Sequence, residues 1–220
     1  MVEKPTTLTR ADYEDYLVYL YFGSTEHALA VCINRAYQDF QRTLTGFGQL
    51  KNGENLREKA KNLLEASLCD LRSHSAAGSM TAGIFDAWHK TTCQDLISHY
   101  NVGRFHLYVG QAQKWINMTF KYIFTLGEKR APGFGMVYPF CHVPFDNVLL
   151  GELKSYGFPA LSCAWSRLDN YDVYFHRQNW IRKRFSIAPM DVEFLLWLEK
   201  QTGTGHGHQH IGIQKYINKI

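Results

Sequence analysis

Apolar residues recur at intervals of three and four along most of the chain, whereas stretches that alternate apolar with polar residues are few. The first spacing places apolar side chains on one face of a helix, and alternation is typical of a half-buried strand. We therefore predict an all-α fold. From this spacing, the capping residues and the glycine and proline breaks, we expect helices at approximately 11–21, 24–44, 55–72, 82–100, 111–126, 147–156, 170–184 and 189–201.

The length of 220 residues suits one large domain or two small lobes, and 45% hydrophobic with 20% charged residues is ordinary for a globular protein. We expect a single domain over residues 1–220. The serine- and glycine-rich break at Ser73–Ser79 is the best candidate for a boundary between two helical lobes. One lobe would combine residues 1–75, approximately, with the C-terminal part, and the other would cover about 80–160.

Several absences in the sequence restrict the protein class. No apolar signal region opens the chain, and no apolar run approaches the roughly 20 residues that a membrane span needs. The five cysteines contain no Cys-x-x-Cys pair, so their spacing predicts neither a disulfide framework nor a zinc or iron–sulfur site. His206, His208 and His210 alternate in a glycine-rich tail without a carboxylate or cysteine partner. We expect a cytoplasmic monomer that needs no metal or cofactor.

A lysine and an aspartate stand at two expected helix starts, on either side of a loop rich in glycine and proline. Gly110-Gln111-Ala112-Gln113-Lys114 opens one helix, and Val143-Pro144-Phe145-Asp146 leads into the next, with Asp146 at an N-cap position. We expect Lys114 in the first turn of its helix, where the positive helix end and a desolvated site favour the neutral, nucleophilic amine. A carboxylate near C1′ of a sugar stabilises the positive charge that develops as an N-glycosidic bond breaks.

This order of glycine, lysine, loop and aspartate resembles the helix-hairpin-helix DNA glycosylases. The separation of 32 residues between Lys114 and Asp146 is similar to that in the archaeal branch of 8-oxoguanine glycosylases. The resemblance covers about 103–156 and implies a two-lobed helical enzyme in which Lys114 is the nucleophile and Asp146 stabilises charge. Two departures stand out: Tyr108-Val109-Gly110 replaces the usual hairpin sequence, and Asn147-Val148 replaces the Thr-His of many relatives.

An enzyme that excises a base must flip it into a pocket and hold it by stacking and by contacts to its edge. A tryptophan on a helix is more often a core residue than a stacking platform, and a surface lysine or arginine is often only solvated. With these alternatives open, the candidates for the base pocket are Gln113, Trp115, Asn117, His142 and Trp88. The candidates for contact with DNA are Gly110, Gln111, Lys121, Arg177 and Arg182.

The leading hypothesis is a DNA N-glycosylase, with or without lyase activity, whose partner is double-stranded DNA containing a modified base. The preferred substrate is a bulky phage-type pyrimidine such as glucosylated hydroxymethylcytosine, removed by a nucleoid-associated bacterial enzyme in antiviral defence; the alternative is 8-oxoguanine in DNA repair. A second hypothesis is a helical nucleic-acid-binding protein without catalysis. In that case Lys114 contacts a phosphate and Asp146 only caps a helix. A helical toxin-type ribonuclease ranks last, because its Arg-to-His motif is not evident.

Overall fold

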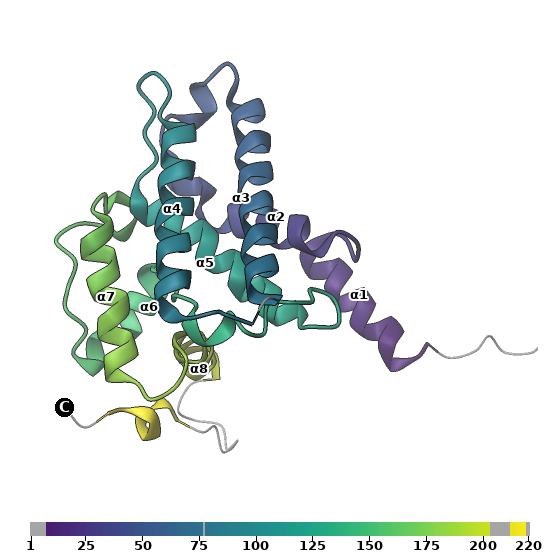
Figure 1. Cartoon of the computed structure of the whole chain (residues 1–220), viewed down its shortest axis with the longest axis vertical. Coiled ribbons are helices and arrows are strands. Elements are labelled where there is room, and N and C mark those ends of the chain that lie inside the picture. The colour runs from purple at the N-terminus through teal and green to yellow at the C-terminus, as the bar shows by residue number, and fades with distance from the viewer. Residues whose placement is uncertain (1–7, 77, 203–211, 219–220) are drawn as a thin grey trace, which may run out of the picture.

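The computed structural model describes residues 8–76, 78–202 and 212–218, and within these ranges it contains helices and no β-strand (Figure 1). The prediction of an all-α fold is confirmed. The α-helices are α1 (Arg10–Phe22), α2 (Ala28–Phe40), α3 (Gly53–Ala76), α4 (Ala82–Tyr100), α5 (Val109–Leu126), α6 (Asn147–Leu153), α7 (Tyr171–Arg184) and α8 (Pro189–Thr202). Short 3₁₀ turns join several of them, among these Gln41–Thr43 and Trp165–Arg167. None of the described helices has the length and apolar character needed to cross a bilayer.

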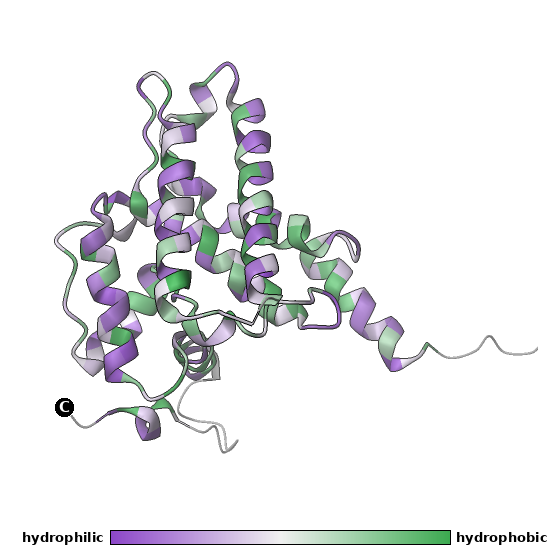
Figure 2. Ribbon diagram, in the orientation of Figure 1, coloured by the Kyte–Doolittle hydropathy of each residue, from purple (hydrophilic) through white to green (hydrophobic). Residues whose placement is uncertain are grey.

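Helix α5 forms the centre of the molecule, and α2, α4 and α7 pack around it (Figure 1). Nearly every residue of α5 is buried, including polar residues such as Gln113, Lys114 and Asn117. Helix α3, which packs against α2 and α4, has a hydrophobic and a hydrophilic side (Figure 2). Because α5 is enclosed on most sides, each of its polar side chains needs a partner inside the protein.

Capping residues predict several helix starts correctly. Thr9 and Asp12 form the expected capping box of α1, and Asp146 caps α6 through a hydrogen bond from a backbone N–H. Asn170 caps α7 in the same way, and α8 begins at Pro189, as predicted. These signals are local, which is why the sequence is sufficient to identify them.

Helix α3 extends four residues beyond its predicted end, to Ala76. Ser73 donates its hydroxyl to the carbonyl of Cys69 at 2.9 Å, and His74 donates Nδ1 to that of Asp70 at 2.8 Å, so the polar residues of the expected break lie along the helix. Helix α3 then packs along α4, and one hydrophobic cluster runs from α2 to the C-terminal 3₁₀ turn. The stretch at Ser73–Ser79 therefore joins two helices of one hairpin and marks no break in the core.

The starts of α2 and α5 also differ from the predicted ones, and the contacts around them explain why. Helix α2 begins at Ala28 instead of Ser24, because the Ser24 hydroxyl accepts the N–H of Glu26 at 3.1 Å and His27 has a left-handed backbone. Helix α5 begins two residues before the predicted start, since Gln111 accepts the N–H of Tyr108 at 3.0 Å and so caps the helix from within. Lys114 consequently lies in the second turn of α5, and the prediction of a first-turn lysine is wrong.

Candidate active site

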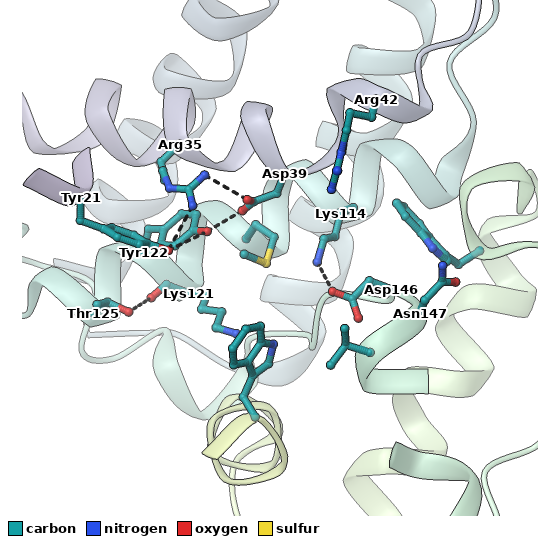
Figure 3. Close-up of a pocket in the computed structure, with 14 residues that line it drawn as sticks. Tyr21, Arg35, Asp39, Arg42, Lys114, Lys121, Tyr122, Thr125, Asp146 and Asn147 are labelled. Carbon is teal, nitrogen blue, oxygen red and sulfur yellow. Dashed lines mark hydrogen bonds and ion pairs between the residues drawn. The ribbon is translucent and has the colours of Figure 1, made fainter. Parts of the chain in front are cut away.

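Lys114 and Asp146 meet in an ion pair although 32 residues separate them along the chain (Figure 3). Nζ of Lys114 lies 2.5 Å from Oδ2 of Asp146, while Oδ1 of Asp146 accepts the N–H of Leu149 at 2.8 Å. Each carboxylate oxygen thus has its own donor, and the orientation of the carboxylate is fixed. The Lys114 side chain is 5% exposed and that of Asp146 is 19% exposed, so the pair meets solvent mainly through the aspartate.

A glutamine beside Lys114 fixes the residue before Asp146. Gln113 donates Nε2 to the carbonyl of Phe145 at 3.1 Å, and its Oε1 accepts the N–H of Phe145 at 3.1 Å. Residues 113 and 114 therefore pair in order with residues 145 and 146. The loop cannot slide along α5 without losing both contacts. Gln113 is fully buried by this pairing, so in this conformation it does not offer the predicted contact to a base edge.

Two further amides hold the same loop from other directions. Gln178 of α7 pairs with both backbone groups of Val143, at 3.1 and 2.8 Å. Asn117 of α5 donates Nδ2 to the carbonyl of Val143 at 3.1 Å and to the hydroxyl of Tyr174 at 2.8 Å. The loop of residues 141–145 is buried outside any helix, so side-chain amides satisfy the backbone groups that secondary structure would otherwise pair. Asn117 was predicted to line the base pocket, but its side chain instead holds this loop in place.

His142, another predicted pocket residue, lies behind this loop in a buried network. Its Nε2 donates to Asp86 at 2.9 Å, and the hydroxyl of Tyr174 donates to its Nδ1 at 3.0 Å. Burial lowers the pKa of His142 to about 4, so the ring is neutral at physiological pH and suits both hydrogen bonds. Arg182 holds Asp86 through two bonds of 2.8 Å. Burial by itself would raise the pKa of Asp86, but the bonds from His142 and Arg182 lower it to about 2.

The Lys114–Asp146 pair opens into a cleft of about 550 Å³, a size typical of ligand pockets. Residues from α1, α2, α5, α8 and the start of α6 surround it. In addition to the pair, the cleft is lined by Tyr21, Arg35, Asp39, Arg42, Met118, Lys121, Tyr122, Thr125, Asn147, Val148, Trp165 and Trp197.

One face of α5 forms a wall of this cleft. Lys114, Met118, Lys121, Tyr122 and Thr125 follow one another at helical spacing, so they lie on the same side of the helix. The sequence-based prediction contains only the two lysines of this set. Helical spacing counted from Lys114 is the signal that would have identified the others.

A charged cluster on the far side of the cleft is absent from the sequence-based prediction. Arg35 donates Nη1 to Asp39 at 3.1 Å, and the hydroxyl of Tyr122 donates to the other carboxylate oxygen at 2.5 Å. The guanidinium of Arg35 also lies over the ring of Tyr21, 4.7 Å from its centroid. Burial, with the hydrogen bond to Asp39, raises the pKa of Tyr122 and keeps the phenol protonated. The i, i+4 spacing of Arg35 and Asp39 is the only local signal for this cluster.

Arg42 points into the cleft towards Lys114 and makes no hydrogen bond or ion pair with any described residue (Figure 3). Its 3₁₀ turn is tied to α5, because Gln111 donates Nε2 to the carbonyl of Thr43 at 2.7 Å and to its hydroxyl at 3.1 Å. A guanidinium held at such a place without a partner is suited to a phosphate. No feature of the sequence distinguishes Arg42 from an ordinary solvated arginine.

Lys121, predicted to contact DNA, is held by a second ion pair. Its Nζ lies 2.5 Å from Oε1 of Glu193 in α8, and its ammonium is 5.1 Å from the centre of the Trp197 ring. Glu193 is 1% exposed, and its Oε2 has no hydrogen-bond partner within the described part of the chain. Burial raises the pKa of Glu193, and the opposite charge of Lys121 counteracts part of that effect. Lys121 is therefore not free for a phosphate in this conformation.

Gly110 and Gln111, the residues at the start of α5 that were predicted to contact DNA, make their hydrogen bonds within the protein. The N–H of Gly110 donates to the carbonyl of Leu168 at 2.8 Å, and a Cβ at position 110 would lie 1.7 Å from the carbonyl oxygen of Trp165. Gln111 is buried by its bonds to residues 43 and 108. Neither residue presents a donor to a phosphate, and both contribute to the position of α5.

The two predicted tryptophans lie in the core. Trp115 is fully buried, and its Nε1 donates to the carbonyl of Ile33 at 3.0 Å. Trp88 is half-buried, with its Nε1 donating to the carbonyl of Ser67 at 3.0 Å. The tryptophans that do line the cleft are at positions 165 and 197.

The two predicted arginines of α7 lie outside the cleft lining. Arg177 donates to the carbonyls of Pro159 and Ala160, at 3.0 and 3.2 Å. Arg182 holds Asp86 and also donates to the carbonyl of Phe140 at 2.7 Å. Both guanidinium groups stabilise loops that surround the site.

Across the described ranges, no three His, Cys, Asp or Glu side chains come together as a metal site, and histidines 206, 208 and 210 lie outside those ranges. Comparisons of the chain with protein-family models, with curated proteins and with solved structures give no match. Function is therefore inferred from the geometry of this chain and from the sequence resemblance described above.

Proposed function

We propose that the protein is a DNA N-glycosylase in which Lys114 is the nucleophile and Asp146 stabilises positive charge on the sugar. One observation carries the proposal: the amine of Lys114, in the second turn of α5, and the carboxylate of Asp146, at the N-cap of α6, meet at 2.5 Å in a cleft large enough for a nucleotide. The sequence resemblance assigns these two roles to the same two residues. The buried clamps around loop 141–145 support it further, because precise placement of reacting groups accounts for much of an enzyme's rate.

The pair has the chemistry that base excision with lyase activity needs. An amine in an ion pair is an ammonium, and it must lose a proton before it can attack; Asp146 is the nearest acceptor. The neutral amine of Lys114 then attacks C1′, and the glycosidic electron pair leaves with the base, which takes up a proton. Opening of the sugar ring gives a Schiff base between Lys114 and C1′. Asp146 passes the proton that it accepted from Lys114 to the departing base, so that its carboxylate is again charged and faces the carbon on which positive charge develops.

Other cleft residues suit the binding of a flipped nucleotide. Trp165 and Trp197 offer ring faces for stacking, and Arg42, which has no partner among the described residues, offers a guanidinium for the flanking phosphate. The turn between α4 and α5 directly precedes Tyr108-Val109-Gly110, where the resemblance expects a DNA-binding hairpin, and it exposes Gly103 and Arg104. With Gly110 and Gln111 occupied, this turn is our preferred contact to the DNA backbone.

For the substrate, we prefer a bulky modified pyrimidine such as glucosylated hydroxymethylcytosine, which would make the protein a bacterial antiviral defence enzyme. The cleft of about 550 Å³ continues past the Lys114–Asp146 pair to the Arg35–Asp39–Tyr122 cluster, whose polar groups suit a hydroxylated substituent on the base. The alternative is 8-oxoguanine in base-excision repair, which would leave that cluster without a role.

One observation favours a different class, a helical nucleic-acid-binding protein without catalysis. The Lys114 side chain is 5% exposed and already paired, as a purely structural lysine would be. In that case Asp146 acts only as an N-cap and as the partner of the lysine.

Borohydride trapping separates the two classes. Duplexes that carry an abasic site or a modified base are incubated with the protein and sodium borohydride, and the products are separated by denaturing electrophoresis. We expect a covalent complex that Lys114→Gln abolishes and Lys121→Gln retains. Mass spectrometry of the bases freed from damaged and phage-modified DNAs then identifies the substrate, with Asp146→Asn as the blank. Absence of both a complex and a released base on every DNA would overturn the proposal.

A further inference from the structure

Helix α1 extends away from the rest of the molecule and contains no buried residue (Figure 1). Several large apolar side chains on it are more than half exposed: Tyr13 (56%), Tyr16 (58%), Leu17 (63%) and Leu20 (60%). These four residues follow the spacing of one helix face, so they form a continuous outward stripe. An apolar stripe of this kind on a surface helix is typical of an interaction surface.

The stripe faces outward because the opposite side of α1 is anchored. Val18 and Phe22 pack against the core, and Asp15 pairs with Arg130 at 2.5 Å. The capping box at Thr9 and the left-handed Gly23 define the two ends of the helix. A helix of 13 residues is only marginally stable by itself, so these contacts and caps hold α1 in place.

We propose that the stripe pairs with the same stripe of a second copy of this chain, with the two α1 helices antiparallel. A two-fold axis between Tyr16 and Leu17 places Tyr13 of one copy against Leu20 of the other. Every apolar residue of the stripe then meets another, as in the self-complementary interfaces of symmetric dimers. This proposal does not depend on the enzymatic function.

The apolar area of the stripe is sufficient for a reversible dimer. A large side chain that is about half exposed offers on the order of 100 Å². The four stripe residues would bury roughly 400 Å² per copy and roughly 800 Å² in total. An interface of this size lies at the weak end of specific association, so the dimer should dissociate on dilution.

Charge on α1 favours a second copy over DNA or an anionic membrane. Asp12, Glu14 and Asp15 outnumber Arg10 on this helix, whereas membrane-surface helices and DNA contacts are rich in lysine and arginine. In the antiparallel pair, Asp12 lies opposite Tyr21 of the second copy and Glu14 opposite Tyr19, so no carboxylate faces another.

The mass of the full chain in solution, measured by analytical ultracentrifugation over a wide range of concentration, tests the proposal. We expect a monomer–dimer equilibrium, which Leu17→Glu weakens at least tenfold because the two new carboxylates meet near the axis. Met136→Glu is the matched control: Met136 is 56% exposed outside the stripe, on the loop after α5, and should leave the equilibrium unchanged. Circular dichroism checks that both variants remain folded.

Cysteine cross-linking tests the antiparallel arrangement. In a Cys163→Ser background, which removes the exposed native cysteine, a mixture of Tyr13→Cys and Leu20→Cys chains should give a cross-linked heterodimer with a short bis-maleimide, whereas either variant alone and Met136→Cys should not. A monomeric mass at all concentrations would overturn the proposal, as would a dimer that Leu17→Glu leaves intact. A monomer that binds phosphatidylglycerol vesicles through α1 would assign the stripe to a membrane and also overturn it.

Discussion

Helix α5 carries two lysine–carboxylate pairs, two turns apart on one face, and their surroundings differ. In both pairs Nζ lies 2.5 Å from a carboxylate oxygen. Asp146 bonds its other oxygen to the N–H of Leu149 and reaches the cleft, whereas Glu193 is buried with its other oxygen unpartnered within the described residues. The Lys121–Glu193 pair is therefore an internal reference for the Lys114–Asp146 pair.

The difference teaches that the distance between an amine and a carboxylate does not distinguish a reactive pair from a structural one. What differs is the access of a substrate and the control over the orientation of the carboxylate. Three amide side chains, those of Gln113, Asn117 and Gln178, hold the segment that leads into Asp146. Glu193 lies within a regular helix and needs no such support.

The two pairs should differ most in the rate of base release after each carboxylate is replaced by its amide. We expect Asp146→Asn to reduce base release by about 10²- to 10⁴-fold, since asparagine can still cap α6 but cannot stabilise positive charge. Glu193→Gln should leave base release within a few fold of the parent. Single-turnover release of the base is the measurement. Equal losses in the two variants would remove the distinction between the pairs.

Stability should show the reverse contrast. Lys121→Met leaves the buried Glu193 without its counter-charge and should lower the free energy of unfolding by about 3 kcal/mol. Lys114→Met should cost only about 1 kcal/mol, because Asp146 keeps the bond from Leu149 and its access to solvent. Urea denaturation followed by circular dichroism measures both. A larger loss in Lys114→Met would contradict the assignment of Lys121 as the structural lysine.

Only the Lys114–Asp146 pair is backed by a histidine network, so acid should affect this region first. Burial lowers the pKa of His142 from 6.5 to about 4 and that of His89 well below 6.5. As pH falls through this window the unfolded chain binds protons that the folded chain does not, and His142 alone should cost roughly 3 kcal/mol of stability by about pH 4. Urea midpoints across this range test it. His142→Asn should flatten the dependence, and an unchanged midpoint in the parent would refute it.

A substitution of Gln113 tests whether its pairing with the backbone of Phe145 positions Asp146 next to Lys114. Gln113→Met should leave two backbone groups of Phe145 unpaired and shift Asp146, which we expect to lower kcat by about 10²-fold with little change in KM. Gln178→Met disturbs Val143, three residues before Asp146, and serves as the control with a smaller effect on kcat. The pH profile of kcat should move in the first variant alone. Equal effects would indicate general loss of packing.

The smallest effect is expected at the mouth of the cleft. Arg42→Ala should weaken DNA binding a few fold and reduce the salt dependence of binding by about one phosphate contact. Arg42→Lys should restore part of the affinity, and borohydride trapping at saturating DNA should be unchanged. Binding curves at several salt concentrations measure it. Affinity that does not respond to Arg42→Ala would remove this residue from the DNA-binding surface.

The parts of the fold that sequence predicts are those with local causes. The capping box at Thr9, the N-cap at Asp146 and the proline at 189 define helix starts through contacts within one turn. Lys114 and Asp146 could be chosen as a pair because the sequence predicts a helix start, next to glycine or proline, close to each of them. The start of α5 was harder to predict, since Gln111 caps the helix from inside it.

The parts that sequence does not predict depend on how distant helices cross. Nothing local indicates that Lys121 meets Glu193, or that Arg42 lies in the same cleft as Lys114, because both depend on where α8 and the 41–43 turn pack. Likewise, helical spacing identifies the stripe on α1, but only tertiary contacts determine that it faces outward. Trp115 follows the general rule that a helical tryptophan is usually a core residue.

The close packing around Gly110 limits which residues evolution can accept at this position. A side chain at this position would overlap the carbonyl oxygen of Trp165 and push that tryptophan out of the cleft wall, so even alanine should be selected against. The loop between α5 and α6, by contrast, can change length as long as its last two residues still meet positions 113 and 114. Relatives too diverged for ordinary sequence comparison should therefore retain glycine four residues before the lysine while their loop lengths drift, and genomes can be searched for that asymmetry.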